Sequence, residues 1–162
     1  MLKGGIFFNM TNLSFCSSSD AGTFSTASQT ALATNTVINL TQQVLVGTSI
    51  SFTSPNTINL KPGSYIVRYS LLGLPINSGA LIAVGLRLNG VIITQTSIAY
   101  SSNGNGSAYP EATGAYLITI NTNSTLQLVA RTPVTYPIAT INAVLTANNV
   151  QTAQLTIFKI KG

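Results

Sequence analysis

The stretch Leu86-Arg87-Leu88-Asn89-Gly90-Val91-Ile92 decides the fold class, because it has the pattern of two strands joined by a two-residue turn. Asn-Gly accepts the two positive φ angles of a type I′ turn, whose twist matches that of the flanking strands. Apolar residues stand on both sides of the turn. The stretch therefore predicts a tight antiparallel hairpin.

The same kind of pattern continues in both directions from the hairpin. Short runs of β-branched and polar residues alternate and are separated by Gly, Pro and Asn, which is typical of strands at regular spacing. No segment shows a sustained helical period, and β-branched side chains lose rotamer freedom against a preceding helical turn. The predicted strands are Val37–Val46, Ser49–Thr53, Thr57–Leu60, Ser64–Leu72, Leu81–Leu88, Val91–Ile98, Gly114–Ile120, Thr125–Arg131, Ile138–Leu145 and Gln151–Ile160.

The run Ser64–Leu72 indicates which face of a strand is buried. Alternate residues on one face are aromatic or aliphatic, namely Tyr65, Val67, Tyr69 and Leu71. We expect both tyrosines to pack in the core and not to form a shelf for a carbohydrate. About eight to ten antiparallel strands of this kind predict an all-β jelly-roll sandwich.

The first part of the chain differs in composition from the rest. A short apolar tip is followed by a tract of Ser and Thr, and sustained strand patterns begin only at Val37. We interpret residues 1–36 as an extended N-terminal arm or connector and residues 37–162 as one jelly-roll trimerisation domain. The total length suits a single domain.

Sparse charge is the main compositional feature. Only 6% of the residues are charged, against roughly 25% in an average globular protein. Few charges mean little electrostatic repulsion between copies, so we expect self-association. The basic residues behind the net charge of +5 are scattered, which argues against nucleic-acid binding. Apolar runs are far shorter than the ~20 residues that span a bilayer, so no membrane insertion is expected.

The residues that usually carry catalysis are nearly absent. The chain has no His, and its only carboxylates are Asp20 and Glu111. An imidazole-based triad or metal site is therefore impossible, and a carboxylate pair would need both groups in one cleft near Glu111. We expect no enzymatic activity, no catalytic residue, no metal and no cofactor.

Four segments together resemble one known family: Ile50–Thr53 (ISFT), Ile58–Tyr69 (INLKPGSYIVRY), Gly85–Val91 (GLRLNGV) and Ala153–Ile160 (AQLTIFKI). Over Val44 to Gly162 the chain resembles the globular domain of BclA-type exosporium proteins, which have a tumour necrosis factor-like or complement-type jelly roll. The resemblance implies a homotrimer around a threefold axis on the outer layer or appendages of bacterial spores. Unlike proteins with a collagen-like stalk, this chain has no Gly-X-Y repeat.

The arm suggests how trimers join into a fibre. Some 36 extended residues reach ~120 Å at most, enough to leave one trimer and dock on the next. A strand that one trimer adds to the sheet edge of its neighbour binds through backbone hydrogen bonds, and apolar side chains anchor it. The candidate assembly residues are Ile6, Phe7, Phe8, Leu13, Phe15 and Cys16. As the only cysteine, Cys16 is either a free thiol or a disulfide partner of another chain.

Our functional hypothesis is a self-assembling structural protein of the spore surface, with itself and other spore-surface proteins as partners. Only Ile6–Phe8 form a contiguous apolar stretch near the start, so we expect deposition without a classical signal peptide. The alternative is a trimeric receptor- or carbohydrate-binding head, such as a phage tail-fibre tip. Its recognition loops would be Ser101–Pro110 and Thr132–Pro137, because loops on a rigid scaffold carry most binding sites.

Overall fold

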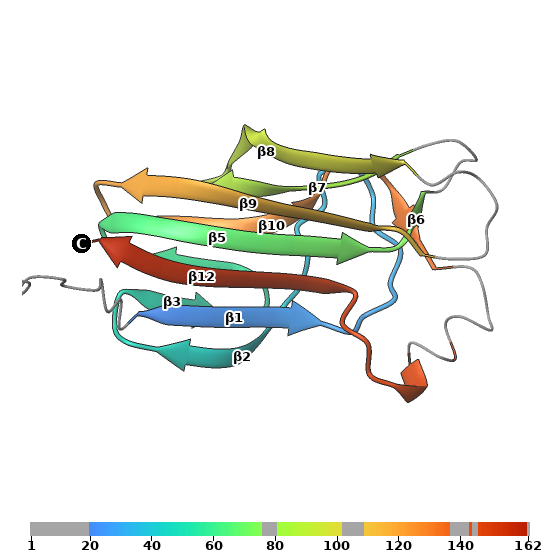
Figure 1. The fold of residues 1–162 in the computed structure, drawn as a ribbon, viewed down its shortest axis with the longest axis horizontal. Coiled ribbons are helices and arrows are strands. Elements are labelled where there is room, and N and C mark those ends of the chain that lie inside the picture. The colour runs from blue at the N-terminus through green and yellow to red at the C-terminus, as the bar shows by residue number, and fades with distance from the viewer. Residues whose placement is uncertain (1–19, 76–80, 102–108, 137–142, 144–145, 162) are drawn as a thin grey trace, which may run out of the picture.

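A computed structural model of the chain describes residues 20–75, 81–101, 109–136, 143 and 146–161. Nearly all of the regular secondary structure in this part is β-strand (Figure 1). The strands are β1 (Ala21–Thr26), β2 (Thr41–Val46), β3 (Ile50–Thr53), β4 (Thr57–Leu60), β5 (Gly63–Leu72), β6 (Leu74–Pro75), β7 (Leu81–Leu88), β8 (Val91–Ser101), β9 (Glu111–Ile120), β10 (Ser124–Ala130), β11 (Val134–Thr135) and β12 (Ala153–Lys161).

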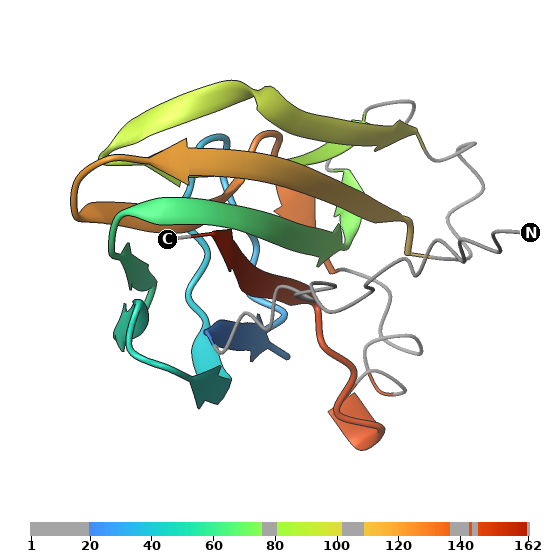
Figure 2. The same ribbon diagram turned by 60° about the vertical axis from the view of Figure 1, so that its left-hand side comes forward.

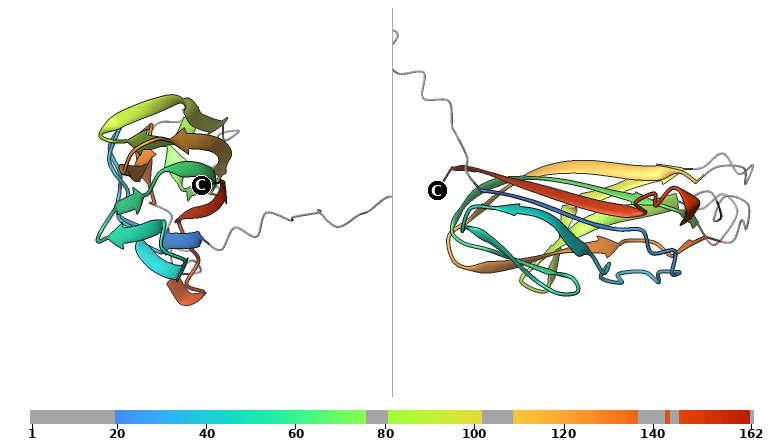
Figure 3. Two further views of the ribbon diagram at one scale, coloured as in Figure 1. Left: turned by 90° about the vertical axis from the view of Figure 1, so that its left-hand side faces the viewer. Right: turned by 90° about the horizontal axis from the view of Figure 1, so that it is seen from below.

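The strands form two five-stranded antiparallel sheets that pack face to face (Figures 1 and 2). The first sheet has the order β2-β1-β12-β5-β9, and the second has the order β3-β4-β10-β7-β8. Strands β6 and β11 make a small additional pair. Seen from below, the two layers run along the length of the molecule (Figure 3). The predicted jelly-roll sandwich is confirmed.

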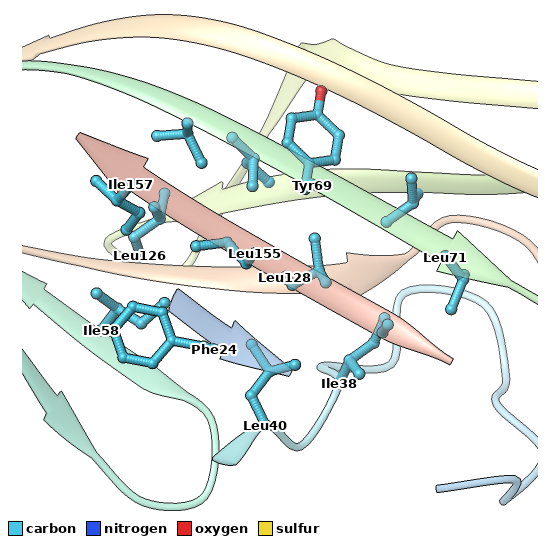
Figure 4. Packing of buried hydrophobic residues seen from close by; sticks show 14 of the residues in the cluster. Phe24, Ile38, Leu40, Ile58, Tyr69, Leu71, Leu126, Leu128, Leu155 and Ile157 are labelled. Atoms are coloured by element: carbon cyan, nitrogen blue, oxygen red, sulfur yellow. The ribbon is translucent and has the colours of Figure 1, made fainter. Parts of the chain in front are cut away.

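The core lies between the two sheets (Figure 4). Tyr65, Val67, Tyr69 and Leu71 are all buried, as predicted from the alternation in β5. Both tyrosine hydroxyls form hydrogen bonds within this apolar layer. That of Tyr65 donates to the carbonyl oxygen of Lys61 at 2.7 Å, and that of Tyr69 donates to a backbone carbonyl oxygen in β8. Both tyrosines are therefore core residues and not a ligand shelf.

The hairpin between β7 and β8 has the predicted turn. Asn89 and Gly90 have φ angles of 48° and 80°, and Leu88 pairs with Val91. The Asn89 side chain also accepts a hydrogen bond from the backbone nitrogen of Thr125 at 2.8 Å, which ties the turn to β10. Asn89 thus both forms the turn and accepts a hydrogen bond from the neighbouring strand β10.

The predicted boundary of the arm at residue 36 is wrong. Strand β1 lies inside the first sheet between β2 and β12, and Phe24 is fully buried. The backbone nitrogens of Asn35 and Ile38 donate to carbonyl oxygens of Ala130 and Leu128 in β10. The sequence signal was weak because Phe24 is the one large apolar residue that β1 contributes to the core. The Ser/Thr tract therefore resembled a linker.

Other boundaries agree within a few residues. Strands β4 and β7 have the predicted limits, whereas β8 extends to Ser101 and β9 begins at Glu111. The predicted strand Ile138–Leu145 lies outside the described residues except for Ala143, which is helical. In the described part, no helix is long and apolar enough to cross a membrane.

Candidate interaction surface

An apolar row crosses the outer face of the first sheet, with one residue from each strand. The register pairs Val46 with Ala21, Ala21 with Phe158, Phe158 with Ile66, and Ile66 with Leu117. Three large members are strongly exposed: Val46 at 51%, Phe158 at 42% and Leu117 at 59%. We call these five residues the apolar row. A continuous exposed strip of this kind marks an interaction site more often than scattered apolar residues do.

The apolar row exists because strict alternation breaks down in several strands. In β12, Ile157 points into the core and the next residue, Phe158, points outward. In β9, Leu117 is exposed and Ile118 is buried. Consecutive apolar residues in one strand mean that both of its faces are apolar. The consecutive apolar residues are visible in the sequence, but only the strand register shows that their outward members are level with one another.

A shallow hollow of about 610 Å³ adjoins the apolar row on the same face. It reaches from Phe158 toward the end of the sheet where β9 begins. Its charged members are Arg68 and Glu111, and hydroxyl and amide groups lie between them on Ser70, Thr113 and Gln154. Because the hollow is open, its polar groups are available to another molecule.

The two carboxylates of the chain lie at opposite ends of the first sheet. Asp20 precedes Ala21, which is level with Phe158 and hence with Ile66 of β5. Glu111 pairs with Leu72, six residues farther along β5 and about 20 Å away at the usual rise per residue. Glycoside-type chemistry needs two carboxyl groups within about 10 Å. The hollow at Glu111 therefore holds no carboxylate pair.

The carboxylate of Asp20 is hydrogen-bonded by residues of the turn before β3. Its carboxylate accepts a hydrogen bond from the backbone nitrogen of Thr48 at 3.0 Å, and a hydrogen bond from Ser49 is the main reason why its pKa lies below 3.8. The positive charge of Lys159, which donates to the Ser49 hydroxyl at 2.9 Å, lowers this pKa further. These contacts join the start of β1 to the turn before β3.

The residues proposed for assembly from sequence are not placed by the structure. Ile6, Phe7, Phe8, Leu13, Phe15 and Cys16 all lie outside the described residues. Their role stays a prediction. Across the described ranges, no group of three or more metal-ligating side chains is present.

The described residues Tyr109 and Tyr136, one from each loop predicted as a recognition tip, meet at one end of the sandwich. The rings of Tyr109 and Tyr136 lie 5.7 Å apart between centroids. Tyr136 is only 6% exposed, its hydroxyl donates to the carbonyl oxygen of Leu72 at 2.7 Å, and burial raises its pKa to about 12. This ring therefore anchors the loop to the sandwich, and residues 102–108 of the other loop are outside the described part.

Comparison with known proteins supports the fold. No family model matches the sequence, and no curated protein matches it. The crystal structure of murine APRIL at pH 5.0 matches with a TM-score of 0.58 and 10% identity over 86% of this chain and 98% of that one. Eiger TNF from S. frugiperda matches at 0.59 and 12% identity over 86% and 90% of the two chains. The globular domain of zebrafish complement 1qA matches at 0.54 and 9% identity over 86% and 94%. The chain therefore has a jelly roll of the tumour necrosis factor and complement type.

Proposed function

We propose that this chain is a structural, self-associating subunit of a bacterial spore surface, and that three copies pack around a threefold axis. The observation that carries the proposal is the apolar row, which leaves Val46, Phe158 and Leu117 in solvent in a single chain. Complete burial of a fully exposed side chain of this size contributes roughly 1.5–3 kcal/mol, so covering these half-exposed side chains contributes about half of that each. Sparse charge adds little repulsion against close approach of copies.

A closed ring of three copies needs two different complementary surfaces on each copy, because its contacts are heterologous. The apolar row supplies one of them. The edge formed by β8 and β9 supplies the other, since Ile98 is 36% exposed and Tyr100 is 52% exposed there. We infer that the β8–β9 edge of one copy lies on the outer face of the first sheet of the next.

Leu117→Ser tests the association directly, with Leu81→Ser as its matched control. Both residues are exposed leucines, at 59% and 45%, but Leu81 belongs to β7 in the second sheet and lies outside the apolar row and outside strands β8 and β9. Sedimentation equilibrium should show trimers for the natural chain and for Leu81→Ser. For Leu117→Ser we expect a dissociation constant at least about tenfold higher. A natural chain that stays monomeric, or a Leu117→Ser variant that associates like it, contradicts the proposal.

The spore-surface location rests on the sequence resemblance to BclA-type domains and needs its own test. We expect antibody labelling of sporulating cells that produce the full chain to mark the outermost spore layer in electron micrographs. Label confined to the cytoplasm of vegetative cells would contradict this location. The measurement is independent of the oligomeric state in solution.

Fibre formation through the N-terminal arm is tested by deleting residues 2–19. The deletion stops before Asp20 because β1 belongs to the sandwich. Negative-stain electron microscopy should show filaments of the full chain and separate trimers of the shortened one. Separate trimers from both forms would exclude arm-mediated fibres. They would favour a displayed receptor- or carbohydrate-binding head, and the candidate loops of such a head include Tyr109 and Tyr136, whose rings are in contact.

A further inference from the structure

The outer face of the first sheet carries two opposite charges beside the apolar row. Arg68 lies near the middle of the face on β5, and Glu111 lies at the start of the edge strand β9. Both side chains are exposed, and both line the hollow. In a chain with only 6% charged residues, two charges on a surface proposed to be an interface need an explanation.

Arg68 differs from the other two arginines of the chain. Arg87 donates to the carbonyl oxygen of Gly90 at 2.8 Å, and Arg131 donates to the hydroxyl of Ser97 at 3.0 Å. Arg68 makes no hydrogen bond or ion pair with any residue that the structure describes. Its guanidinium group is therefore left for a group outside this part of the chain.

Glu111 is likewise the carboxylate that remains available. Asp20 is bound by Thr48 and Ser49 at the other end of the sheet, whereas Glu111 has no partner among the described residues. The register also explains why Glu111 and Arg68 do not pair within one chain. Arg68 is level with Ala115, four residues and about 13 Å from Glu111 along the strands.

We propose that Glu111 of one copy pairs with Arg68 of the next copy, so that a trimer holds three such pairs. The inference rests on the proposed trimer, in which the β8–β9 edge of one copy lies on the first sheet of another. Glu111 begins the edge strand β9 that enters this contact, and Arg68 lies on the outer face of the first sheet that receives it. An Arg-carboxylate pair is often bidentate and hence directional.

Charge complementarity makes this pair a determinant of register and partner choice. The apolar row attracts copies without direction, because hydrophobic contact is proportional to area and not to orientation. An interfacial pair of opposite charges fixes one arrangement and penalises those that bring like charges together. The partner in this inference is a second copy of the same chain.

The experiment is a charge-exchange cycle on the full chain, followed by sedimentation equilibrium. The variants are Arg68→Glu, Glu111→Arg and the double exchange, with Lys61→Glu as the control that changes the net charge as much as Arg68→Glu does. Lys61 is exposed and lies in the turn before β5, outside the apolar row. Arg68→Gln and Glu111→Gln remove one partner without adding a repulsive charge.

Each single reversal should raise the trimer dissociation constant about tenfold or more, and the double exchange should return it to within about threefold of the natural value. Lys61→Glu should leave it unchanged, and both Gln variants should weaken the trimer less than the reversals do. If the natural chain forms trimers but single reversals have no effect, the pairing is overturned while the trimer stands. A stronger trimer in Arg68→Gln would also overturn the pairing, because it would place the arginines beside one another. A monomeric natural chain would overturn both proposals.

Discussion

The outer faces of the two sheets have opposite character. On the second sheet, the amide nitrogen of Gln127 donates to Asn56 Oδ1 at 3.2 Å and to Thr57 Oγ1 at 3.1 Å. The side chain of Asn59 donates to the Thr53 hydroxyl at 3.0 Å. On the first sheet, the apolar row of Val46, Ala21, Phe158, Ile66 and Leu117 faces outward instead.

This difference separates a surface whose polar groups are hydrogen-bonded within one chain from a surface whose apolar side chains remain exposed to water. The polar side chains of this part of the second sheet satisfy one another across β3, β4 and β10, so their hydrogen bonds need no partner from another molecule. The apolar side chains of the first sheet gain stability only when another surface removes them from water. The two regions therefore differ: the β3-β4-β10 part of the second sheet is polar and internally hydrogen-bonded, whereas the apolar row of the first sheet is the surface for which we proposed a contact.

Gly114→Ala should have the largest effect, because the added methyl group would collide with core side chains beneath the outer face of the first sheet. A Cβ at this position would lie 2.6 Å from Cζ of Tyr69, a buried ring in the layer between the sheets. Strand β9 must then move outward and displace Leu117. We expect a loss of about 1–3 kcal/mol in the free energy of unfolding, measured by chemical denaturation, together with weaker association. Ala115→Ser, an exposed change on the same strand, should alter stability little, and equal stability of the two variants would contradict the argument.

The contrast between the faces also shows what the sequence can predict. The Asn89-Gly90 turn and the alternation in β5 are local signals, and both predicted the structure correctly. Strand β1 was missed because a single large residue, Phe24, holds it in the core by contacts with distant parts of the chain. The apolar row was missed for a related reason: its members come from five strands, and only the register brings them level.

Gln127→Leu tests the hydrogen-bonded polar side chains on the outer face of the second sheet. The substitution removes two hydrogen bonds to Asn56 and Thr57 at a partly buried position. We expect a loss of about 1 kcal/mol in the free energy of unfolding and no change in oligomeric state. Phe158→Ser on the first sheet should do the reverse, since its ring is 42% exposed in the single chain. Loss of trimers in Gln127→Leu, measured by sedimentation at unchanged stability, would remove the distinction between the two faces.

The smallest effect is expected at the end of the first sheet, where Asp20 links β1 to the turn before β3. A hydrogen bond from Ser49 lowers the pKa of Asp20 below 3.8 in the folded chain, so the folded state binds a proton less readily than the unfolded state does. The stabilisation that the ionised Asp20 carboxylate provides is therefore complete above the unfolded pKa and is lost as the pH falls through the folded pKa.

Thermal unfolding midpoints of the natural chain should decrease below about pH 4, and Asp20→Asn should reduce this decrease while lowering the midpoint at pH 7. Lys159 contributes in the same direction, because its positive charge stabilises the ionised carboxylate. Ser49→Ala removes the hydrogen bond that lowers this pKa and keeps the carboxylate of Asp20. If Ser49→Ala leaves the acid dependence as steep as in the natural chain, the dependence does not come from the contact between Asp20 and Ser49.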